Sequence, residues 1–137
     1  YIPNIVETSG GVTRTFLYLL VDAYEEEDLG EGNMRTVLKI HKDIAAYRAA
    51  IFPLVGNKED IVKKAREVFD LLADSHKVVW DGRGNIGKRY RYQDEIGTPY
   101  CITVDYETLE NDTVTVRDRD TMKQERVKTE DLNLYIS

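Results

Sequence analysis

Residues 77–119, KVVWDGRGNIGKRYRYQDEIGTPYCITVDYETLENDTVTVRDR, alternate between strand and helix patterns and so decide the fold. Three short runs rich in β-branched and aromatic residues are of strand type: Val78–Trp80, Tyr100–Val104 and Thr113–Val116. The first run leads into the turn-forming residues Asp81–Asn85, the last of which is a suitable helix N-cap. Gly97 suits the end of the helix that follows, and Glu110–Asp112 predicts a turn between the last two strands.

The predicted helix carries a basic stretch, although the chain as a whole is acidic. One helical face is formed by Ile86, Tyr90, Gln93 and Gly97. Most of the basic residues lie off that face or in the preceding turn: Arg83, Lys88, Arg89 and Arg91. No acidic residue occurs in 82–91, and Tyr90 and Tyr92 are interleaved with the cations. Cations combined with aromatic rings suit phosphates and unstacked bases, and a solvated helix face is the alternative interpretation.

Composition narrows the classes of function. A formal net charge of −6 argues against a generic nucleic-acid coat, but it allows a local basic patch aimed at one structured RNA. The single cysteine, Cys101, permits no disulfide within the chain. His41 and His76 stand apart from other ligands and nucleophiles, so we expect neither a metal site nor Ser/His catalysis. No run approaches the ~18 apolar residues of a membrane span.

The N-terminal segment combines a strand pattern, a glycine pair and a helix pattern. Tyr1–Val6 is apolar, and because the chain begins inside this pattern without a Met, we expect a piece of a longer protein. Apolar residues spaced by three and four then predict a helix with a core-facing stripe: Val12, Phe16, Leu19, Leu20 and Ala23. We expect this helix to fray at Glu25–Asp28, where the helix dipole disfavours anions. Gly10, Gly11 and Arg14 suit either an anion-binding corner or a tight turn with a surface ion pair.

The rest of the chain continues the alternation of strands and helices. Further predicted elements are a linker at 29–33, a short strand at 34–40, a buried strand at 47–55, a helix over 58–74 capped by Asn57, and a final helix from Thr129. Residues 117–120, RDRD, suit either base-reading arginines held by their own ion pairs or a solvated hairpin edge. The order of elements predicts an α/β fold, a mixed sheet with helices on its faces.

Three segments in this order resemble the glycyl-tRNA synthetases, a family of class II aminoacyl-tRNA synthetases. Residues 3–20, PNIVETSGGVTRTFLYLL, resemble the third class II signature motif with its Gly-x-x-Arg joint. Residues 80–104 resemble the family's Ile-Gly-(Lys/Arg)-Arg-Tyr pattern, followed by Asp-Glu-Ile-Gly and an apolar strand. Residues 117–126, RDRDTMKQER, are similar to the family's Arg-Asp-Arg-Asp-Ser-Met segment. The resemblance spans nearly the whole chain and is weakest at 25–45.

The resemblance implies a fragment of two parts. Residues 1–45 would be a strand-helix remnant of the catalytic domain and a linker, and residues 46–137 would be the anticodon-binding domain. That domain would be a mixed sheet of about five strands flanked by about three helices. The parent would attach glycine to its tRNA through a glycyl-adenylate, using ATP with Mg²⁺. Because the first two class II motifs are absent, we expect the fragment alone to be inactive and to bind no cofactor tightly.

The resemblance also assigns site residues in the N-terminal part. The implied glycine-binding residues are Glu7, Thr8, Ser9, Gly10 and Gly11. The implied ATP-binding residues are Gly11, Val12, Thr13 and Arg14. A carboxylate can pair with the ammonium group of glycine, and a wall close to the α-carbon excludes any side chain. Thr8 stands where many members of the family have proline.

The expected tRNA contacts rest on charge and on the role of the domain. They are Arg83, Lys88, Arg89, Arg91, Arg117, Arg119 and Met122. The implied partner is a glycine tRNA, with glycine, ATP and a homodimer in the parent, in the cytoplasm, and with neither membrane nor DNA. The alternatives are a non-catalytic, anticodon-binding-like accessory RNA-binding module and a plain βα-sheet domain. Glu7–Arg14 disfavours an accessory module, because such a protein needs no glycine-sized pocket.

Overall fold

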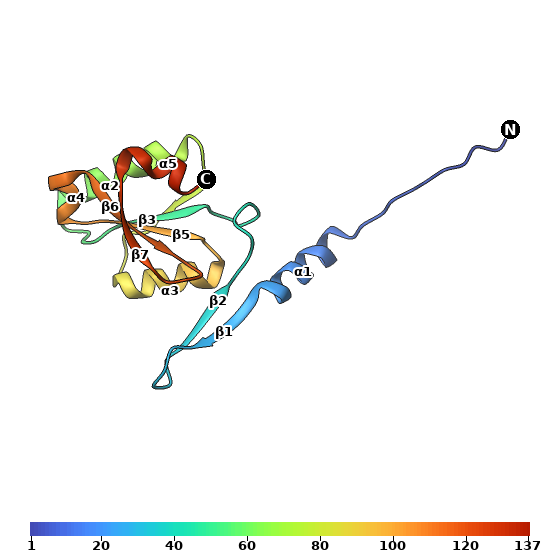
Figure 1. Cartoon of the computed structure of the whole chain (residues 1–137), viewed down its shortest axis with the longest axis horizontal. Helices are drawn as coiled ribbons and strands as arrows, with labels where there is room; N and C mark the ends of the chain where they lie inside the picture. Colours follow the sequence, from blue (N-terminus) through green and yellow to red (C-terminus); the bar gives the residue numbers. More distant parts are fainter.

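A mixed sheet of five strands forms the centre of the structure, a computed structural model that describes residues 1–137. The strands lie in the order β4-β3-β5-β6-β7, with bounds Ala49–Pro53 (β3), Val78–Trp80 (β4), Tyr100–Val104 (β5), Thr113–Asp118 (β6) and Gln124–Lys128 (β7). β3 pairs in parallel with β4 and β5, whereas β6 is antiparallel to both β5 and β7. The mixed five-stranded sheet predicted from the sequence is therefore confirmed (Figure 1).

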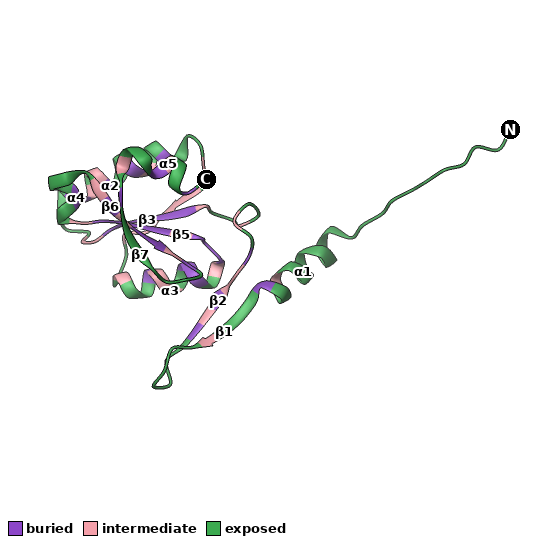
Figure 2. Cartoon of the chain, viewed as in Figure 1, coloured by how far each residue is buried: buried purple, intermediate pink, exposed green.

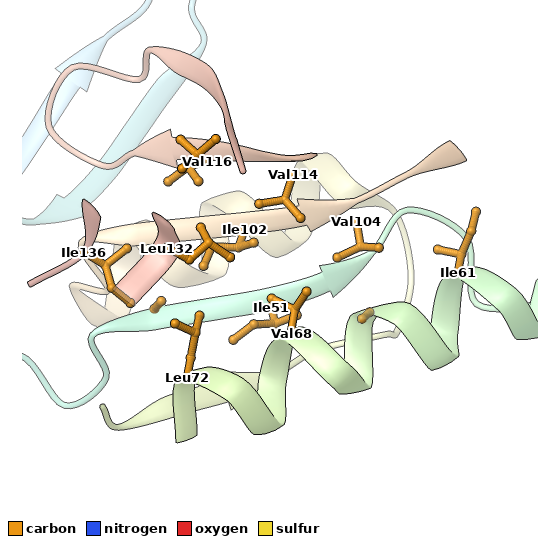
Figure 3. Packing of buried hydrophobic residues seen from close by; sticks show 13 residues of the cluster. Ile51, Ile61, Val68, Leu72, Ile102, Val104, Val114, Val116, Leu132 and Ile136 are labelled. Atoms are coloured by element: carbon orange, nitrogen blue, oxygen red, sulfur yellow. The ribbon is translucent and has the colours of Figure 1, made fainter. Parts of the chain in front are cut away.

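Helices cover both faces of this sheet. Their bounds are Glu59–Ala73 (α2), Ile86–Ile96 (α3), Tyr106–Asn111 (α4) and Leu132–Tyr135 (α5), with a 3-10 turn at Thr129–Asp131 before α5. Successive side chains of β3 point to opposite faces: Ala49 and Ile51 pack with α2 and α5, and Ala50 and Phe52 lie on the side of α3. Figure 3 shows Ile51 in the larger of these clusters, beside the helix that carries Val68. Apolar residues at every position of β3 fit a strand buried on both faces.

Helix α2 carries the predicted apolar stripe. Its buried residues recur at helical spacing: Ile61, Ala65, Val68 and Leu72. The predicted cap is wrong, because Lys58 rather than Asn57 is the N-cap residue, and it makes no side-chain cap bond. The chain is still extended at Lys58, so Asn57 lies one residue outside the helix. Glu59 and Asp60 in the first turn complement the helix dipole instead.

Both predicted ends of α3 are confirmed. The Asn85 side chain accepts a hydrogen bond from the Gly87 backbone N–H at 2.8 Å, which satisfies one free donor of the first turn. At the other end Gly97 adopts the left-handed conformation, with φ 81°. The N–H of Thr98 then donates to the Gln93 carbonyl, so the last turn is closed.

The N-terminal residues extend away from the sheet (Figure 1). Residues 1–11 form neither helix nor strand, so the predicted strand at Tyr1–Val6 is wrong; no other strand of the chain pairs with it. Helix α1 (Val12–Ala23) forms as predicted, but Ala23 is its only buried residue (Figure 2). Most of the expected core-facing stripe is therefore exposed, namely Val12, Phe16 and Leu19, because no other element of the chain covers them.

A β-hairpin follows α1 directly. β1 (Tyr24–Asp28) pairs antiparallel with β2 (Met34–Leu38), and the predicted linker forms the turn between them. The predicted fraying helix end at 25–28 is thus wrong. Cations of the opposite strand and its continuation neutralise the acidic residues: Lys39 contacts Glu25 at 2.6 Å, and Arg35 contacts Glu27 at 2.7 Å.

The C-terminal part differs from the prediction at one connection. The sequence predicts a turn at residues 110–112, but helix α4 joins β5 to β6. Asp105 and Thr108 cap this helix reciprocally, a pairing that favours a helix over a turn. The predicted final helix is present as the 3-10 turn and α5. None of the helices is both long and apolar enough to cross a membrane.

Candidate nucleic-acid interface

The structure divides the predicted tRNA contacts between two ends of α3. Arg83 and Lys88 lie at the N-terminal end, next to the carboxyl ends of β3 and β4. Arg117 pairs with Cys101 at the start of β5, because β6 runs antiparallel to β5, and Met122 lies in the turn that follows β6. The seven residues therefore do not form one continuous patch.

Arg89 is buried beneath the turn that precedes α3, not on the solvent side of the helix as expected. Its guanidinium donates to the carbonyl oxygens of Pro53 at 2.7 Å, Gly84 at 2.8 Å and Arg83 at 3.0 Å. These bonds join the end of β3 to the β4–α3 turn. The prediction that Arg89 faces away from the core is wrong, because backbone carbonyls gather around a cation that the sequence alone places on the surface.

A buried ion-pair cluster occupies the C-terminal end of α3. Asp94 is fully buried and accepts hydrogen bonds from Arg117 at 2.8 and 3.0 Å and from the Arg35 Nε at 2.9 Å. Arg35 belongs to β2 and also contacts Glu27 of β1. Two arginines and two carboxylates balance in charge, and they attach the hairpin to the sheet body.

Arg119 lies in the same region and is also directed inward. It donates to the carbonyls of Ile40 and Gly97, each at 2.9 Å, and forms a two-pronged ion pair with Asp120. Its own carbonyl accepts a bond from the Arg35 guanidinium. Direct base contacts by Arg117 and Arg119 stay predictions, and both side chains already have structural partners.

The remaining predicted contacts are more accessible. Arg83 and Lys88 are exposed, and neither forms an ion pair. Arg91 is half-buried and donates to Asn33 and to the Met34 carbonyl, so it ties the hairpin turn to α3. Met122 is exposed with φ 58° in the β6–β7 turn.

A pocket that the sequence did not reveal lies at the carboxyl ends of β3 and β4. It has a volume of about 600 Å³ and is lined by Pro53, Gly56, Val62, Arg66, Trp80, Asp81, Gly82 and Arg83. The sequence predicts Trp80 in the strand run Val78–Trp80 and a helix over 58–74, which includes Arg66. The guanidinium carbon of Arg66 lies 3.8 Å from the centroid of the Trp80 ring, so the two side chains stack. Only the fold brings them together.

The predicted glycine- and ATP-binding residues form no enclosed site in this chain. Residues 7–14 are exposed, and the backbone around Gly10 and Gly11 faces no other element. Arg14 and the free N–H groups at the start of α1 suit an anion, but no opposite wall is present.

Burial raises the pKa of the Cys101 thiol to about 12, so it is protonated at neutral pH and a poor nucleophile.

The sequence is similar to a known domain family and, over nearly its whole length, to known enzymes. Residues 48–137 match the family profile described as the anticodon binding domain. Over 136 residues, 99% of the chain, the sequence is 52% identical to a glycine–tRNA ligase of Borreliella afzelii and 52% identical to one of Clostridium kluyveri. It is 51% identical over its whole length to a glycine–tRNA ligase of Clostridium tetani. The chain spans 29–30% of the length of these relatives.

Proposed function

The chain belongs to the anticodon-binding domain family, and from this membership we infer that it is the tRNA-binding, C-terminal part of a glycine–tRNA ligase. The observation that carries the inference is the likeness to such ligases over 99% of the chain, which includes the residues before the anticodon-binding match. An accessory RNA-binding module is disfavoured, because it would not need the segment that precedes the domain.

The division into two parts is also proposed. Residues 46–137 are the anticodon-binding domain, and residues 1–45 belong with the catalytic domain of the parent. The exposed stripe of α1 supports this division, since a helix with one apolar side packs against a partner in a stable protein. The parent is proposed to act as a cytoplasmic homodimer and to join glycine to a glycine tRNA at the expense of ATP with Mg²⁺.

The chain by itself does not fit an ATP or glycine site. Glu7 and Arg14 carry charges suited to an ammonium group and a phosphate, yet they contact no second element that could enclose a substrate. We therefore assign these residues one wall of the parent's site and derive no reaction step from them.

The isolated chain is expected to form no glycyl-adenylate. One wall of a site provides neither the water exclusion nor the orientation that adenylate formation requires. Glycine-dependent exchange of labelled pyrophosphate into ATP measures the reaction, with a full-length glycine–tRNA ligase as the positive control. Exchange above background by the purified chain would contradict this expectation.

Arg83 and Lys88 are expected to bind tRNA phosphates. Replacing both by glutamate should weaken binding of a glycine tRNA transcript roughly tenfold or more. The slope of the logarithm of the binding constant against the logarithm of the salt concentration should also become shallower by about one per cation, because fewer counterions are released. Binding titrations at two salt concentrations measure both quantities. The matched control is the pair Lys77→Glu and Lys128→Glu, two exposed cations outside α3. Equal losses in both double variants would show a non-specific charge effect and remove Arg83 and Lys88 from the interface.

A further inference from the structure

We propose that the pocket at the carboxyl ends of β3 and β4 binds one unstacked nucleotide of the tRNA, with its base on the Trp80–Arg66 pair. This inference rests on the proposed function, since it requires that the domain binds tRNA. It goes beyond that function by assigning a base-binding subsite to Trp80 and Arg66, neither of which is among the predicted tRNA contacts.

The position and size of the pocket suit a nucleotide. Ligands of open α/β sheets bind outside the carboxyl ends of the parallel strands, and Pro53 and Trp80 are the last residues of two such strands. The volume of about 600 Å³ lies in the range of small-molecule sites. Exposed Arg83 at the rim places a cation where the phosphate of an inserted nucleotide would lie.

Stacking surfaces are already in place. Trp80 is held from behind by Phe69, whose ring meets it edge-on at 6.4 Å between centroids. The Arg66 guanidinium, which belongs to an exposed residue, lies on the Trp80 ring. Bases stack on both indole rings and guanidinium planes. Because contacts with the Trp80 and Phe69 rings are what hold the Arg66 guanidinium, it can move aside and close over a base that enters.

The residues that line the pocket leave room for a base and can form hydrogen bonds with its edge. Gly56 and Gly82 line the pocket without side chains; a Cβ at Gly82 would lie 3.3 Å from the Trp80 Nε1 and 3.6 Å from the Pro53 Cγ. The Asp81 carboxylate uses one oxygen to accept the Arg83 N–H at 2.9 Å. Its second oxygen has no partner in the chain and can accept a bond from an exocyclic amino group.

Trp80 is the only tryptophan of the chain, so its fluorescence reports on this pocket alone. The probe is an RNA hairpin that carries the anticodon stem and loop of a glycine tRNA, titrated into the full chain. We expect binding to quench the fluorescence. Hairpins with an abasic nucleotide at each anticodon-loop position in turn identify the inserted base: one position should abolish most of the quenching, and the others should leave it unchanged.

Two variants test the pocket by different means. Arg66→Ala removes half of the stacking pair, and Gly82→Leu fills the space without a change of charge; each should raise the dissociation constant of the hairpin about tenfold. Both substitutions should remove the effect of the abasic nucleotide. Lys77→Ala, at the opposite end of β4, is the control and should bind as the unaltered chain does. Circular dichroism confirms that each variant is folded.

The outcomes separate the two proposals. If the unaltered chain does not bind the hairpin at all, the proposed tRNA-binding function fails. If it binds, but without quenching and with unchanged affinity in Arg66→Ala and Gly82→Leu, tRNA binding stands and the nucleotide pocket is refuted. Quenching that every abasic hairpin retains would also refute it, because no base would then lie against Trp80.

Discussion

Replacing Asp94 by alanine should lower the free energy of unfolding by about 3–5 kcal/mol, the largest effect expected of any single charged residue in the chain. Asp94 is fully buried between Arg35 and Arg117, and its removal leaves two buried guanidinium groups without their shared carboxylate. Glu27 still contacts Arg35, but no other carboxylate contacts Arg117. Urea denaturation followed by circular dichroism measures the change.

Two further variants show whether burial is the cause. Glu130→Ala breaks an exposed ion pair with Lys128 and should change stability very little. The triple variant Arg35→Met, Asp94→Leu and Arg117→Met removes the charges together, and it should recover most of the lost stability because apolar groups of similar volume replace a buried ion cluster. A loss no larger in Asp94→Ala than in Glu130→Ala would show that the cluster contributes little.

The ion-pair cluster around Asp94 also orients the N-terminal part of the chain relative to the sheet. Arg35 lies on the hairpin that connects α1 to the sheet, and Asp94 and Arg117 lie in the sheet body. Their bonds fix the direction in which residues 1–23, which precede the hairpin, extend away from the sheet (Figure 1). In the proposed parent, this direction would set the placement of the anticodon-binding domain relative to the catalytic domain. Arg117 would then support the function through geometry, without a base contact.

Elements whose signals are local were predictable from the sequence. Asn85 and Gly97 mark the two ends of α3 because a cap depends on residues within one turn of the helix. The continuous apolar run that predicted β3 likewise depends on neighbours in the sequence. By contrast, Glu25–Asp28 forms a strand because Arg35 and Lys39 lie opposite it. The sequence of residues 25–28 alone does not indicate those partners.

The candidate site was predictable only in part. Charge identified Arg83 and Lys88, which are exposed as expected. Arg89 is buried because backbone carbonyls from two separate segments accept hydrogen bonds from it, Pro53 at the end of β3 and Gly84 in the β4–α3 turn. The Trp80–Arg66 stack joins a strand to a helix and has no signature in spacing. Burial of cations and pairing across elements are properties of the fold, so residue type alone assigned Arg89 to the wrong environment.

Replacing Gly97 by alanine should destabilise the protein by roughly 2–5 kcal/mol, through two effects that add. Gly97 has φ 81°, and an L-residue in this conformation costs about 1–2 kcal/mol. A Cβ there would also lie 2.8 Å from the Ile40 Cγ2 and 2.9 Å from the Leu38 carbonyl oxygen, and overpacking of this kind typically costs about 1–3 kcal/mol. Thermal and urea unfolding measure the sum.

Gly84→Ala is the matched control at the other end of α3. Gly84 has a similar conformation, with φ 70°, but no atom lies within 4 Å of the position of its Cβ. Gly84→Ala should therefore lose only the conformational part of the stability, and the difference between the two variants isolates the contact of Gly97 with Leu38 and Ile40 at the end of the hairpin. Because residues 38–40 lead from the hairpin into the domain, Gly97→Ala should also make the hairpin amides exchange faster with deuterium, whereas Gly84→Ala should not. Equal losses of stability and unchanged hairpin exchange in both variants would mean that the hairpin does not pack against Gly97 in solution.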